Sequence, residues 1–135
     1  MASADEARPH IRVVAAEIED DGSFLITQRR PEASMPLLWE FPGGRVADGE
    51  SDADALSRTI NARIGCGATV GEKTMEMSHD YEAYTLSLVS YRVTLIGTPT
   101  TRYVNDLRWV KPEDFGDYEF PGADQKTVDT LLSDD

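Results

Sequence analysis

A pair of glycines and an isolated glutamate lie in a stretch whose pattern suits phosphate binding. Gly43 and Gly44 follow a short apolar strand and form a predicted turn, and the polar loop after them ends at Glu50. A helix is predicted to begin after Ser51, which suits the N-cap position, and to end at Gly65. A strand, a glycine turn and a helix in this order leave backbone N–H groups exposed where a phosphate group could bind.

The predicted helix carries apolar residues on one narrow arc. Ala53, Leu56, Ile60 and Ile64 recur at helical spacing, so we expect this arc to face the core.

This stretch resembles the signature sequence, or box, of the Nudix hydrolases of the MutT type. The signature is a Gly, five residues, a Glu, seven residues, then Arg-Glu, an apolar residue, any residue, Glu-Glu, any residue, Gly and an apolar residue. The preceding residues, WEFPGG at positions 39–44, also resemble the start of a MutT-type box. The matching positions are Gly44, Glu50, Arg58, Ile60, Gly65 and Cys66.

Three positions inside the box depart from the signature. The family places metal-binding glutamates there, whereas this chain has Thr59, Ala62 and Arg63. Their spacing predicts that all three lie on one helix face, outside the apolar arc. Mg²⁺ requires hard oxygen ligands, and Arg63 places a fixed positive charge where cations would bind. A hydrolase of the standard kind is therefore not expected.

The rest of the chain predicts an α/β fold. Residues 20–22, Asp-Asp-Gly, predict a hairpin turn, and a final helix is predicted over residues 123–132. This order matches the Nudix fold, an α/β/α sandwich around a mixed β-sheet. We expect a flexible lead over residues 1–10 and a single Nudix domain over residues 11–135. The predicted strands are residues 11–19, 23–29, 68–77, 84–96 and 107–110.

Composition restricts the partners. The chain has 25 Asp and Glu against 13 Lys and Arg, a net charge of −12. This balance argues against nucleic-acid polymers and anionic membranes, although a local cluster of arginines can still bind a small anion at physiological salt. The single cysteine, Cys66, excludes an intramolecular disulfide. With no signal peptide or membrane span in the sequence, we expect a cytoplasmic protein.

The resemblance to MutT-type proteins also implies ligand contacts. Arg29 ends the second strand, where the family's arginine approaches the bound nucleotide, although a solvated strand end would have the same pattern. Asp124 follows FPGA at positions 120–123. It would read the base edge by accepting from exocyclic amino groups, or would be an ordinary acid of the first helical turn. The candidate substrate-binding residues are Arg29, Phe41, Gly43, Gly44, Arg63 and Asp124.

The candidate catalytic residues are Glu50 and Arg58, which match the box. Glu50 and Asp106 could also hold a metal, with Mg²⁺ as the cofactor of an active enzyme; the alternative is that such acids form a solvated face. The two histidines lack the spacing of a zinc site.

Three functions remain open. The leading hypothesis is a degenerate MutT-type protein that recognises a nucleotide or nucleoside diphosphate derivative, with weak or no metal-dependent hydrolysis. The second is an active Mg²⁺-dependent nucleoside triphosphate pyrophosphohydrolase, similar to an 8-oxo-dGTP diphosphatase, that uses Glu50 and loop acids. The third is a ligand-free interaction or structural module that binds a protein partner, because a fold does not determine a function.

Overall fold

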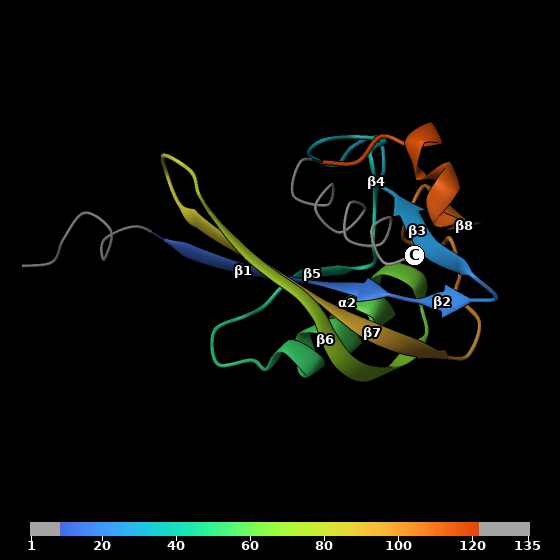
Figure 1. Cartoon of the computed structure of the whole chain (residues 1–135), viewed down its shortest axis with the longest axis horizontal. Helices are drawn as coiled ribbons and strands as arrows, with labels where there is room; N and C mark the ends of the chain where they lie inside the picture. Colours follow the sequence, from blue (N-terminus) through green and yellow to red (C-terminus); the bar gives the residue numbers. More distant parts are fainter. Residues whose placement is uncertain (1–8, 122–135) are drawn as a thin grey trace, which may run out of the picture.

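The described part of the chain forms two sheets, and a helix packs against one face of the first sheet (Figure 1). A cluster rich in phenylalanine packs against the other face of this sheet. The computed structural model describes residues 9–121. One sheet has the strand order β5-β1-β7-β6, and in the other β3 pairs with β2, β4 and β8. The elements are β1 (His10–Glu17), β2 (Glu19–Asp20), β3 (Ser23–Gln28), β4 (Trp39–Glu40), β5 (Gly43–Arg45), α2 (Asp52–Ile64), β6 (Gly67–Asp80), β7 (Thr85–Ile96), β8 (Asp106–Val110) and a 3₁₀ helix (Pro112–Asp117).

The first sheet is mixed, as predicted. Strand β1 runs parallel to β7 and antiparallel to β5, while β6 and β7 form a long antiparallel hairpin. Each face carries its own core: Val14 and Val89 pack with α2 on one face, and Ala15 and Leu88 belong to the phenylalanine-rich cluster on the other. Because both faces are covered, β1 is apolar on both sides over residues 13–16 rather than alternating.

Helix α2 begins and ends where the sequence predicted. The Ser51 hydroxyl accepts a hydrogen bond from the Asp54 backbone N–H, and Gly65 adopts a left-handed φ of 71°. The predicted apolar arc is wrong at Ala53, which is exposed, whereas Ala55 is buried. Ala53 has a suitable angular position but lies in the first turn, before the part of the helix that packs on the sheet.

The predicted hairpin is confirmed by the pairing of β2 with β3. Asp21 and Gly22, with φ of 53° and 82°, make its turn. Strand β6 continues to Asp80 and contains irregularities between Val70 and Met75. No helix within residues 9–121 is long and apolar enough to cross a membrane. The predicted final helix lies outside the described residues.

Candidate functional site

The two box glycines form a strand rather than the predicted turn. They begin β5, and Gly43 and Gly44 pair with Ala15 and Val14 of β1. A Cβ on Gly43, whose φ is 153°, would lie 2.0 Å from the Val14 carbonyl oxygen. A Cβ on Gly44 would lie 2.8 Å from the Thr59 methyl group. Glycine is therefore required at both positions, because β5 lies too close to β1 and α2 to leave room for a side chain.

A small pocket of about 220 Å³ opens beside this strand. It is smaller than the roughly 300–1,000 Å³ of sites that enclose a whole small molecule, so it fits one part of a larger ligand. The structure brings five of the predicted substrate-binding residues to its wall: Arg29, Phe41, Gly43, Gly44 and Arg63. The sixth, Asp124, lies outside the described residues.

Two guanidinium groups share one carboxylate in this pocket. The Arg29 Nη1 atom lies 3.1 Å from the Glu40 carboxylate, and the Arg63 Nη1 atom lies 3.9 Å from its other oxygen. Two positive charges and one negative charge leave a local charge of +1, in a chain whose net charge is −12. Arg45 also lines the pocket and adds to its positive charge. The pocket is therefore cationic on an acidic protein.

Arg29 is held in place by the loop that follows β3. Its Nε atom donates to the Ser34 carbonyl oxygen at 2.7 Å, and its Nη2 atom donates to the Ser34 hydroxyl at 3.0 Å. Only 19% of the Arg29 side chain is exposed. The side chain is thus pre-positioned toward the pocket instead of extending into solvent from the strand end.

Of the three substituted box positions, Thr59 packs against β5 and does not face solvent. Thr59 is buried, and its hydroxyl donates to the Ala55 carbonyl oxygen at 2.8 Å. Its methyl group lies beneath Gly44, and the close contact of α2 with β5 explains this burial. Ala62 is exposed and Arg63 is half-buried.

This donor set does not suit Mg²⁺. The helix offers a hydroxyl already bonded to the backbone, a methyl group and a guanidinium, while Mg²⁺ requires oxygen ligands in octahedral geometry. Within residues 9–121, no group of three or more His, Cys, Asp or Glu side chains could hold a metal ion.

The two candidate catalytic residues, Glu50 and Arg58, bind each other. Arg58 donates to the Glu50 carboxylate from Nε at 2.9 Å and Nη2 at 2.8 Å, and Nη2 also donates to the Arg45 carbonyl oxygen. Glu50 additionally accepts from the Ala47 N–H. The hydrogen bonds from Arg58 lower the pKa of Glu50 to about 2. The pair fastens the polar loop to α2, and so low a pKa makes Glu50 a weak base near neutral pH.

Asp106, the other candidate metal ligand, lies on β8, where it pairs with Gln28 of β3. Its carboxylate accepts from the Leu107 N–H at 2.8 Å and from the Arg108 guanidinium at 3.0 Å. The Leu107 hydrogen bond and Arg108 lower its pKa. This acid is occupied by local partners.

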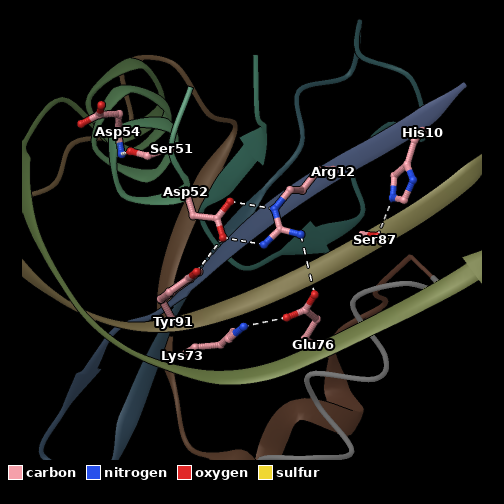
Figure 2. Close-up of polar contacts among 9 residues, drawn as sticks. All are labelled: His10, Arg12, Ser51, Asp52, Asp54, Lys73, Glu76, Ser87 and Tyr91. Atoms are coloured by element: carbon pink, nitrogen blue, oxygen red, sulfur yellow. Dashed lines mark hydrogen bonds and ion pairs between the residues drawn. The ribbon is translucent and has the colours of Figure 1, made fainter. Parts of the chain in front are cut away.

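A polar network at the start of α2 was missed by the sequence reasoning (Figure 2). Arg12 of β1 donates two hydrogen bonds to the Asp52 carboxylate, at 2.8 and 2.7 Å, and the Tyr91 hydroxyl donates a third at 2.6 Å. Arg12 also lies 3.7 Å from Glu76, which binds Lys73. The Arg12 hydrogen bonds lower the pKa of Asp52 to about 2. An arginine inside an apolar strand was the signal that could have indicated this network.

Comparison with known proteins gives a consistent result. The family model described as NUDIX domain matches residues 13–130. The CTP pyrophosphohydrolase of Escherichia coli K12 is 33% identical over 124 residues, covering 91% of this chain and 92% of that protein. The 8-oxo-dGTP diphosphatase of Haemophilus influenzae is 31% identical over 126 residues, covering 92% and 93%.

A solved structure agrees with these matches. The solution structure of the E. coli ORF135 protein superimposes with a TM-score of 0.83 and 32% sequence identity, covering 94% of this chain and 91% of that chain. The predicted Nudix fold is confirmed by this likeness.

Proposed function

This chain belongs to the NUDIX domain family, and we propose that it recognises a nucleotide or nucleoside diphosphate derivative through arginines. In this proposal Arg63 supplies positive charge in place of metal ions on the box helix, and metal-dependent hydrolysis is weak or absent. Membership of the family does not by itself identify a ligand, because only the names of the relatives mention nucleotides.

The observation that carries the proposal is the sharing of Glu40 by Arg29 and Arg63. One carboxylate neutralises only one of the two guanidinium groups, so the second keeps a positive charge that could pair with a phosphate group. At 4 Å and an effective dielectric constant near 20, two unit charges interact by about 4 kcal/mol before desolvation is counted. Guanidinium groups also match phosphate oxygens in a bidentate geometry that a lysine does not offer.

The relatives support a nucleotide as the ligand. One is named for CTP and another for 8-oxo-dGTP. We propose that Asp124 reads the base by accepting a hydrogen bond from an exocyclic amino group, such as that of cytosine. Phe41 and the two box glycines would complete the contact surface.

The second candidate is an active nucleoside triphosphate pyrophosphohydrolase, which the relatives' names favour. In this case Glu50 and Asp106 would have to supply the metal ligands. Both acids already bind an arginine, Arg58 and Arg108 respectively. Exchanging these partners for Mg²⁺ would break ion pairs, so we expect little turnover.

Calorimetric titration with a nucleotide panel, in EDTA and in MgCl₂, tests the proposal when combined with an assay of pyrophosphate release. We expect at least one nucleoside triphosphate to bind in EDTA and to stabilise the fold by about 2.7 kcal/mol at a hundredfold excess over its Kd. Binding that requires Mg²⁺ together with rapid pyrophosphate release would support the enzyme instead. No binding in either buffer would support the interaction module.

A further inference from the structure

A second hollow lies at the C-terminal end of α2, outside the arginine pocket. It is an open depression of about 580 Å³ between the exposed face of the helix and the loop of residues 97–105. We propose that this hollow binds the terminal phosphoryl groups of a nucleoside polyphosphate whose inner phosphate lies at Arg29 and Arg63. The inference rests on the proposed function and assigns Arg102 as its main contact. The hollow is lined by Asn61, Ala62, Gly65, Thr100, Arg102 and Tyr103.

The lining offers hydrogen-bond donors and a positive charge. Of the six described residues that line the hollow, Arg102 alone is charged, and the described residues place no carboxylate within ion-pair distance of it. Its guanidinium lies over the Tyr103 ring, 5.3 Å from the ring centroid. A cation–π contact of this kind orients the guanidinium without neutralising it. The amide of Asn61 and the hydroxyl of Thr100 can donate to phosphate oxygens.

The hollow and the arginine pocket adjoin along the helix at two consecutive residues. Ala62 lines the hollow and Arg63 lines the pocket, and consecutive Cα atoms are about 3.8 Å apart. The family signature has a glutamate at position 62, which would place a negative charge in the hollow. The methyl group of Ala62 leaves the positive charge of Arg102 unopposed from the helix side.

The helix C-terminus itself disfavours anions, but its effect is the smaller one here. An α-helix carries about half a negative charge at its C-terminus. The carbonyl oxygens of Asn61 and Ile64 accept from the N–H groups of Gly65 and Thr100, at 3.0 and 2.8 Å. These hydrogen bonds reduce the exposed negative charge, and the full positive charges of Arg63 and Arg102 outweigh it.

The test is calorimetric titration in EDTA with CMP, CDP, CTP and inorganic triphosphate. For Arg102→Ala we expect affinity for CTP and inorganic triphosphate to fall about tenfold, the loss of one charge-assisted contact, with CMP affinity within about twofold of wild type. Ala62→Glu, at an exposed helix position, should likewise weaken the binding of CTP and inorganic triphosphate and leave the binding of CMP nearly unchanged. Arg108→Ala is the matched control, because it removes one exposed arginine whose partner is Asp106.

The outcomes separate this inference from the proposed function. An equal loss of affinity for CMP and CTP in Arg102→Ala, or no loss of affinity for either, would overturn the inference, while nucleotide recognition would stand. Arg102-dependent binding of inorganic triphosphate, with no nucleotide of the panel bound, would support phosphoryl binding in the hollow and contradict nucleotide recognition. Failure of wild type to bind inorganic triphosphate, CTP or any other nucleotide of the panel would overturn both.

Discussion

The two ends of helix α2 differ in how their charges are paired. At the N-terminal end, Asp52 accepts three hydrogen bonds from Arg12 and Tyr91, and only 16% of its side chain is exposed. At the C-terminal end, Arg29 and Arg63 share the single carboxylate of Glu40. The paired groups around Asp52 stabilise the fold and offer no free charge to a ligand. The cluster at Glu40 has one more positive than negative charge, and this excess charge can bind an anion. In the proposed function, the N-terminal end of α2 thus contributes to stability and its C-terminal end to ligand recognition.

The largest expected effect is on stability, from Asp52→Asn. The variant leaves the Arg12 guanidinium with a weaker partner, so the free energy of unfolding should fall by about 2 kcal/mol. Denaturant titration measures this loss. Asp54→Asn is the matched control, since Asp54 also lies in the first helical turn but is exposed. Equal losses in both variants would mean that the helix dipole, and not the network, makes the contribution.

Acid should weaken the N-terminal end in a predictable direction. The pKa of Asp52 falls from 3.8 to about 2 on folding, so its contribution is complete above pH 3.8 and is lost as pH falls through 2. We expect this contribution to reach at most about 2 kcal/mol. Unfolding at pH 5, 4, 3 and 2 should show a shallower decline for Asp52→Asn than for wild type. Parallel declines would contradict the assignment.

Arg63→Ala should change recognition and leave stability nearly intact. The side chain contributes only a 3.9 Å ion pair at a half-exposed position, so the free energy of unfolding should change by less than about 0.5 kcal/mol. Affinity for a nucleoside triphosphate in EDTA should fall about tenfold, or about 1.4 kcal/mol. A stability loss as large as that of Asp52→Asn would remove the distinction between the two ends of the helix.

Local signals in the sequence were sufficient for much of the fold. Ser51 and Gly65 bound α2 because capping depends on side chains near the helix ends, and Asp21-Gly22 makes a turn for similarly local reasons. The grouping of Arg29 with Arg63 came from resemblance to a family, since no local pattern relates residues so far apart. The chemistry of the substituted box positions was readable directly from residue types.

Contacts between distant segments were not predictable in this way. Burial of Thr59 depends on how closely β5 approaches α2, and the strand pairing of Gly43 depends on β1. The bond between Arg12 and Asp52 joins residues 40 positions apart. Helical periodicity indicates which residues share a face, but it does not indicate where along the helix packing begins, which is why Ala53 was assigned to the core.

The most direct test of the central claim is the affinity of Glu40→Gln for CTP in EDTA. Glu40 competes with a phosphate group for Arg29 and Arg63, and glutamine removes this competing charge in nearly the same shape. Calorimetry should show binding about threefold tighter than wild type, or about 0.7 kcal/mol. Weaker binding in EDTA, or a loss confined to buffer with Mg²⁺, would show that Glu40 itself serves the ligand or a metal, and would contradict recognition by unbalanced arginines.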